Sequence, residues 1–163
     1  MKFEKITFTQ YAKAFNSDVD LTQEYNDIKL PYRGTKYSAG YDFFSPFAFD
    51  LEPNETIVIP TGIRWVCNEN EMDRVLQIFP RSGLGFKYQL CLANTVGIID
   101  SDFAHSDNGG HIMVKLVNRG DKTIHIEKGK GFVQGIITEF LTVENEKEIT
   151  EQRNGGFGST DKK

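Results

Sequence analysis

Four stretches of the sequence place polar, reactive or glycine residues where an apolar run ends: "SAGYDFF" (38–44), "PRSGLG" (80–85), "LANTVGIIDSDF" (92–103) and "NRGDKTIHIEKGKGFVQGII" (118–137), which reads first as a hairpin. In the third stretch, Asp100 directly follows two isoleucines. A carboxylate that leaves an apolar strand at the edge of a cavity is well placed to act as a general base. The alternative is a buried aspartate that only caps a turn.

The stretch "PRSGLG" combines groups that bind phosphate. Pro80 ends the preceding apolar run, and Arg81 and Ser82 then offer a guanidinium, a hydroxyl and backbone N–H groups at the start of a possible short helix. Arginine presents a planar fork of donors, and the start of a helix favours anions. A capped turn without a ligand explains the same residues.

The remaining polar residues suit recognition of a planar ligand. The amide of Asn94 can pair with a donor and an acceptor on a base edge. Gly97 permits close approach of the backbone, and Phe103 can form a wall of the same pocket. Asp42 and Gln134 each interrupt an apolar run, so each either reaches a ligand or serves a turn or backbone group.

The chain ends in the glycine-rich stretch "QRNGGFGSTDKK" (152–163). Fixing each residue costs roughly 1–2 kcal/mol, whereas burial of its one large apolar side chain, Phe157, returns only about 1.5–3 kcal/mol. The stretch is therefore either a frayed end or an arm that orders when a ligand binds. Arg153, Ser159 and Thr160 can hold phosphates and Phe157 can stack on a base. We expect a lid that closes over a nucleotide polyphosphate.

The elements that must position these residues are mostly strands. From Ile28 onward, short β-rich runs are separated by Gly, Pro, Asn and Asp turns at intervals of about 8–12 residues, which predicts an all-β antiparallel sandwich or barrel. Apolar pairs four residues apart, Tyr11 with Phe15 and Leu21 with Tyr25, predict two short helices within an N-terminal extension (1–27). A further short helix is weakly indicated at "SGLGFKY" (82–88).

Composition limits the remaining classes of function. The chain has 163 residues, which predicts a single domain (1–163), and its net charge of −4 argues against broad nucleic-acid binding. No apolar run predicts a membrane span or a signal peptide, so we expect a cytoplasmic protein. The cysteines, Cys67 and Cys91, are expected to be buried and reduced. The three histidines lack metal-ligand spacing and are expected at the surface or in strands.

Taken in order, the four stretches and the C-terminal stretch resemble the five motifs of the trimeric dUTPase family (dUTP pyrophosphatases). The resemblance extends from about Leu30 to Thr160 and is carried by "PRSGL", "GIID" and "RNGGFGST". It implies a jelly-roll-like fold with a mobile C-terminal arm (151–163), a homotrimer whose subunits share each active site, and Mg²⁺-assisted hydrolysis of dUTP to dUMP and pyrophosphate. That reaction would limit uracil incorporation into DNA and supply dUMP for dTMP synthesis.

The resemblance also implies a role for each residue. Asp100 would activate the water that attacks the α-phosphorus, and Asp42 would contact the water shell of an Mg²⁺ held mainly by the phosphates. Uracil and deoxyribose would be bound by Asn94, Gly97, Ile99 and Phe103. The phosphates would be bound by Arg81, Ser82, Gly83 and Gln134. From the arm, Phe157 and Gly158 would cover the base while Arg153, Ser159 and Thr160 hold the phosphates.

The chain departs from the family pattern at three places. Phe103 stands where the family usually has tyrosine, the segment "AHSDNGGH" (104–111) resembles the longer version of Gram-positive bacteria and their phages, and residues 1–27 exceed the minimal family core. Two other functions remain open: a dCTP deaminase-like enzyme on the same fold, and a non-catalytic or additional role as a protein-binding trimer. A glutamate base would favour the deaminase, and the corresponding stretch offers Asp100 instead.

Overall fold

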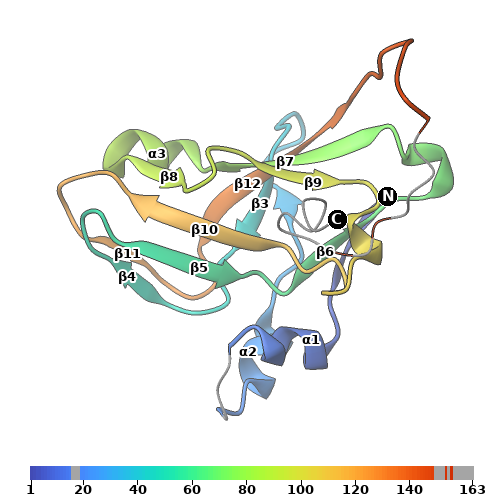
Figure 1. The fold of residues 1–163 in the computed structure, drawn as a ribbon. Coiled ribbons are helices and arrows are strands. Elements are labelled where there is room, and N and C mark those ends of the chain that lie inside the picture. Colours follow the sequence, from blue (N-terminus) through green and yellow to red (C-terminus); the bar gives the residue numbers. More distant parts are fainter. Residues whose placement is uncertain (16–18, 149–152, 154, 156–163) are drawn as a thin grey trace.

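The computed structural model describes residues 1–15, 19–148, 153 and 155, and Figure 1 shows the course of the chain. The helices are α1 (Phe8–Lys13), α2 (Thr22–Asp27) and α3 (Ser82–Tyr88), with single 3-10 turns η1 (Glu69–Glu71) and η2 (Phe103–His105). The strands are β1 (Lys2–Lys5), β2 (Tyr32–Arg33), β3 (Tyr41–Phe44), β4 (Phe49–Leu51), β5 (Thr56–Pro60), β6 (Ile63–Val66), β7 (Arg74–Pro80), β8 (Leu90–Leu92), β9 (Gly97–Asp100), β10 (Met113–Asn118), β11 (Ile124–Ile126) and β12 (Gly131–Glu139).

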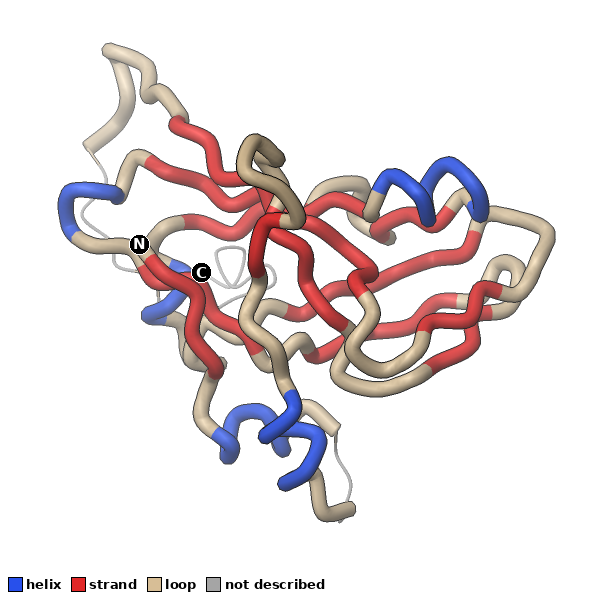
Figure 2. The backbone as a smooth tube through the Cα atoms, turned by 180° about the vertical axis from the view of Figure 1, so that it is seen from behind, coloured by secondary structure: helices blue, strands red, loops and turns tan. Residues whose placement is uncertain are grey.

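The strands pair antiparallel into separate sheets, as the short runs and turn spacing predict. The largest has the order β2-β3-β12-β7-β9, and a second has the order β5-β10-β8. Two further pairs are formed by β1 with β6 and by β11 with β4. In the large sheet, β12 from the last part of the chain lies between β3 and β7. The arrangement is jelly-roll-like, and its sheets do not close into a barrel. Figure 2 shows the same strands from behind.

The core follows from the alternation of side chains along the central strands. Leu76 and Ile78 of β7 are buried on one face of the large sheet. In β12 the adjacent residues Phe132 and Val133 are both fully buried, although neighbours in a regular strand point to opposite faces. A bulge between Gly131 and Val133, where the register to β3 shifts, resolves this conflict.

The N-terminal extension contains one element that the sequence reasoning did not include. Residues 2–5 form β1, which pairs with β6 from Lys2↔Val66 to Lys5↔Ile63. The two predicted helices follow it and lie together beneath the strands in Figure 1. The predicted pair of Tyr11 and Phe15 is present, with ring centroids 5.0 Å apart.

Three further expectations are tested by the fold. The weakly indicated helix is present as α3. Cys67 and Cys91 are free, but both are half-buried and not fully buried as expected. His111 is buried and lies outside the strands, so the expectation of a surface or strand histidine is wrong for this residue. Among the described residues, no helix is long and apolar enough to cross a membrane.

Candidate active site

Three of the predicted site residues meet where β3, β7 and β12 run side by side. Asp42 of β3 lies opposite Gln134 of β12, and Gln134 lies opposite Phe79 of β7. The Nε of Arg81 is 3.2 Å from Asp42 Oδ1, and Gln134 Nε2 donates to the carbonyl of Pro80 at 3.1 Å. We call Asp42, Arg81 and Gln134 the arginine cluster.

The start of α3 borders this cluster. Arg81 takes an extended backbone (φ −66°, ψ 138°) and is the N-cap of the helix, so Ser82 and Gly83 form its first turn. The first N–H groups of a helix have no acceptor within the helix and are available to an anion. A cleft of about 450 Å³ lies over them, and its basic lining side chains are Arg81, Lys87, His125 and Lys130. This arrangement can hold an anionic group of several oxygens.

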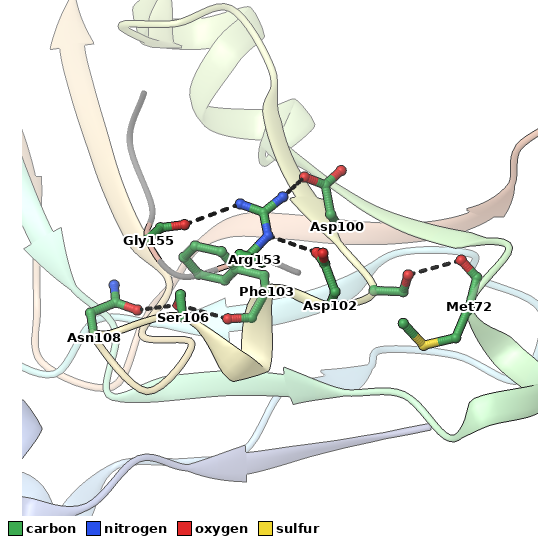
Figure 3. Close-up of polar contacts among 9 residues, drawn as sticks. Met72, Asp100, Asp102, Phe103, Ser106, Asn108, Arg153 and Gly155 are labelled. Atoms are coloured by element: carbon green, nitrogen blue, oxygen red, sulfur yellow. Dashed lines mark hydrogen bonds and ion pairs between the residues drawn. The ribbon is translucent and has the colours of Figure 1, made fainter. Parts of the chain in front are cut away.

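A second group lies at the end of β9. Asp100 ends the strand, Asp102 follows it, and Phe103 opens η2 with its side chain largely buried. Figure 3 shows Arg153 between them: its Nη2 forms an ion pair with Asp100, and its Nε donates to Asp102 Oδ1 at 2.7 Å. The guanidinium carbon also lies 5.7 Å from the centre of the Phe103 ring. We call Asp100, Asp102 and Phe103 the acidic cluster.

An apolar pocket lies along β9, the strand that Asp100 ends. It has a volume of about 490 Å³, and Asn94, Gly97 and Ile99 are among the residues that line it. The apolar run 89–100 is divided into β8 and β9, because Thr95 takes a left-handed backbone (φ 70°) that turns the chain between them. A β-carbon at Gly97 would lie 3.0 Å from Ile78 Cβ, so glycine lets β9 approach β7 closely. The lining is mainly apolar, and Asn94 and Lys115 are its polar residues.

One chain does not bring the two clusters together. Asp100 lies opposite Val75 on β7, and Val75 lies opposite Thr138 on β12. Gln134 precedes Thr138 by four positions along β12, which at about 3.3 Å per residue separates the clusters by roughly 13 Å along the sheet. The acidic cluster therefore lies toward one end of the sheet and the arginine cluster toward the other, while the pocket extends between these levels, because its lining residue Gly97 lies opposite Ile78 and Ile78 lies opposite Gly135.

The segment after the acidic cluster is held by a network that the sequence did not predict. Ser106 Oγ donates to the carbonyl of Phe103 at 2.7 Å, and the amide of Asn108 donates to the carbonyl of His111 at 3.1 Å. His111 Nε2 accepts the backbone N–H of Gly62 at 2.9 Å. Its ring lies 6.3 Å from that of the fully buried Tyr11. Helix α1 thus packs against the 104–111 segment.

Not every predicted residue can be placed. Phe157, Gly158, Ser159 and Thr160 lie outside the described residues. Conversely, Asp102 was not singled out from the sequence, although its spacing two residues after Asp100 is a signal that both acids leave the same strand end. Among the described residues, no group of three or more His, Cys, Asp or Glu side chains is arranged to hold a metal ion.

Comparison with known proteins identifies the family. The family model described as dUTPase matches residues 26–161. A deoxyuridine 5'-triphosphate nucleotidohydrolase of Lactococcus lactis is 39% identical over 135 residues, which cover 82% of this chain and 88% of the relative. The crystal structure of the dUTPase from Streptococcus mutans superposes with a TM-score of 0.66 at 29% identity, covering 89% of this chain and all of the other.

A second solved structure is similar at lower sequence identity and concerns a magnesium ion. A mutant dUTPase from phage phi11 of S. aureus, whose structure reveals the coordination of a structural Mg(II) ion, superposes with a TM-score of 0.59 at 25% identity. The match covers 76% of this chain and 90% of the phage protein.

Proposed function

Since the chain belongs to the dUTPase family, we propose that it hydrolyses dUTP to dUMP and pyrophosphate. Such a reaction limits uracil incorporation into DNA and supplies dUMP for dTMP synthesis. The observation that carries the proposal is the position of Asp100: it ends β9, the strand whose residues Gly97 and Ile99 line an apolar pocket together with Asn94. A general base must reach the proton of the attacking water, so a nucleotide whose base enters this pocket would need its α-phosphate close to Asp100.

Each part of the ligand has a proposed place. Uracil enters the apolar pocket, where the Asn94 amide and the backbone near Gly97 and Ile99 read its edge. The ring of Phe103 packs under the deoxyribose. The phosphates lie over the arginine cluster and the start of α3, where Arg81, Ser82, Gly83 and Gln134 hold their oxygens.

Mg²⁺ is the proposed cofactor, and the donor set fits it. Mg²⁺ keeps several waters and is commonly held by one or two carboxylates together with substrate phosphates. The arginine cluster offers one carboxylate, Asp42, and the cleft beside it has room for a polyphosphate. Asp42 would contact the water shell of the ion, and the ion when bound would neutralise phosphate charge. The protein's own contribution is to orient the phosphates through Arg81 and Gln134.

Asp100 moves the proton in this proposal. Its carboxylate accepts a proton from the attacking water, which makes the water oxygen a better nucleophile toward the α-phosphorus. In the structure the Arg153 guanidinium pairs with Asp100 and Asp102. Phosphate oxygens compete well for such a guanidinium, because it binds them with two parallel hydrogen bonds. Substrate would therefore draw Arg153 from the acids and leave Asp100 open to water.

The proposed assembly is a homotrimer with shared sites. A base must lie within hydrogen-bond reach of the proton that it takes, directly or through one water. The register places Asp100 roughly 13 Å along the sheet from Gln134 within one chain. A site that uses both therefore needs the acidic cluster of one subunit and the arginine cluster of another. We assign the arm, with Phe157, Gly158, Ser159 and Thr160, the closing role over such a site.

The test is pyrophosphate release from dUTP, dCTP, dTTP and UTP, each with Mg²⁺ and with EDTA. We expect metal-dependent release from dUTP alone. Release of ammonia from dCTP would replace the proposal with a deaminase. Release from UTP as well would show that Phe103 does not exclude the 2′-hydroxyl. No turnover of any substrate by a folded oligomer would favour a protein-binding function.

A further inference from the structure

Gly131, the first residue of β12, lies directly against the side chain of Arg81. The Arg81 Nη1 faces the carbonyl of Gly131 at 3.4 Å, and the backbone N–H of Arg81 donates to the carbonyl of Phe132 at 3.3 Å. The guanidinium thus crosses the start of β12 on its way to Asp42, whose Oδ1 is 3.2 Å from Arg81 Nε.

Glycine is required here for space and not for backbone conformation. The left-handed glycines of the described chain are Gly62, Gly109, Gly110 and Gly129, and Gly131 is not among them. A β-carbon built on Gly131 would lie 2.8 Å from Nη1 of Arg81, 3.2 Å from its Cδ and 3.3 Å from its Cζ. Optimal contacts between such atoms are about 3.5–4.0 Å. Any side chain at 131 must therefore displace Arg81.

We propose that Gly131 is a positioning residue for Arg81: its missing side chain leaves the slot in which the guanidinium lies between Asp42 and the start of β12. This inference rests on the proposed function, in which Arg81 holds substrate phosphates. The slot fixes one edge of the guanidinium on Asp42 and Gly131, and the half-exposed side chain borders the phosphate cleft. Arg81 then meets the phosphates already oriented, so less rotamer freedom is lost on binding.

The atoms that a β-carbon at Gly131 would meet all belong to the side chain of Arg81. This side chain is flexible and can swing away at little cost to the fold. At Gly120 the nearest atom is instead the backbone carbonyl oxygen of Tyr88, at 2.5 Å, and backbone cannot move as freely. At Gly85, in α3, the nearest atom is 3.7 Å away, which is ordinary contact. These three glycines separate an effect on Arg81 from an effect on stability.

The experiment compares Gly131→Ala with Gly120→Ala and Gly85→Ala. Gly131→Ala should melt within about 3 °C of the parent protein, yet bind a non-hydrolysable dUTP analogue about tenfold more weakly in titration calorimetry. Compared with Gly131→Ala, Gly120→Ala should lower the melting temperature more and weaken analogue binding less. Gly85→Ala should keep the binding and should not lower the melting temperature, since alanine is favoured over glycine inside a helix. Unchanged binding by Gly131→Ala would overturn the proposal.

A double substitution tests whether Gly131 acts through Arg81. In an Arg81→Ala background, Gly131→Ala should weaken analogue binding no further, because the two effects are not independent. An additional tenfold loss in that background would overturn the proposal. A crystal structure of Gly131→Ala gives a readout that does not depend on the reaction: Arg81 should be turned away from Asp42. If the parent protein fails to hydrolyse dUTP, the proposed function fails, while this structure still tests the slot.

Discussion

At the scale of single residues, Asp100 carries the sharpest chemical prediction. Asp100→Asn keeps the shape of the side chain but removes its ability to accept the proton of the attacking water. We expect kcat for dUTP to fall by about 10²–10⁴-fold, while the analogue dissociation constant changes little. Single-turnover kinetics and calorimetry measure the two effects separately.

The matched control is Asp121→Asn, which makes the same change of charge in the turn before β11, at a residue that belongs to neither cluster. It should leave kcat unchanged. Near-normal turnover by Asp100→Asn would show that Asp100 is not the base. Asp102, the other carboxylate that Arg153 contacts, would then be the next candidate.

The convergence of Asp42, Arg81 and Gln134 was predictable in part from the sequence. Each residue interrupts or ends an apolar run, and antiparallel pairing brings such positions to one sheet edge. The sequence did not reveal that Gly131 forms the slot for Arg81, because this contact depends on the bulge in β12 and on where the side chain turns. Nor did it reveal the pairing of Arg153 with Asp102, which joins residues 51 positions apart.

At the scale of elements, the 104–111 segment is fixed by a buried histidine. Burial lowers the pKa of His111 to about 4 from its ordinary value of 6.5, because a charged imidazole is poorly solvated there. Its neutral form accepts the backbone N–H of Gly62, in the turn between β5 and β6. Protonation would remove that acceptor, so the folded protein favours neutral His111.

This pKa difference predicts how stability depends on pH. Above pH 6.5 His111 is neutral in both the folded and the unfolded chain, and its contribution is fully present. As pH falls from 6.5 toward 4, the unfolded chain takes up a proton that the folded chain does not, so the free energy of unfolding decreases. Between pH 7.5 and pH 5 the loss is about 2 kcal/mol.

Urea unfolding of the parent protein and of His111→Gln, at one protein concentration, measures the effect. Glutamine offers Gly62 an amide oxygen but does not titrate in this range. The free energies of unfolding of the two proteins should therefore converge as the pH falls from 7.5 to 5. A constant difference between them would show that His111 titrates normally in the fold.

The elements themselves were largely predictable, and the exceptions have physical reasons. The helices α1 and α2 were indicated by apolar pairs four residues apart, and α3 by residues 82–88. β1 was missed because "KFEK" is short and polar, and its pairing with β6 is decided by the rest of the fold. The break between β8 and β9 depends on Thr95, a β-branched residue for which a left-handed backbone is not expected.

At the scale of the whole molecule, shared sites predict that two inactive proteins can restore each other. Asp100→Asn leaves the arginine cluster intact, and Arg81→Ala leaves the acidic cluster intact. If each site takes one cluster from each of two subunits, a mixed trimer contains sites with both clusters unchanged. Refolding the two variants together should restore dUTP hydrolysis, measured as pyrophosphate release.

The control mixes the two variants after folding, without exchange of subunits, and should stay inactive. If the co-refolded proteins are no more active than that control, each chain forms its own complete site. The sequence suggested shared sites only through its family resemblance. The register of β7, β9 and β12 adds the physical reason, since it spaces the clusters along one sheet.

The contact between helix α1 and the 104–111 segment has a consequence for how these two parts of the chain evolve. Gln10 Nε2 donates to the carbonyl of Asp107, and the Tyr11 ring lies beside His111. A related protein without the helices would expose the His111 imidazole and the glycine-rich 104–111 segment to solvent. The two additions should therefore be inherited, lost or transplanted as one unit, and a chimaera that carries only one of them should fold less well than either parent.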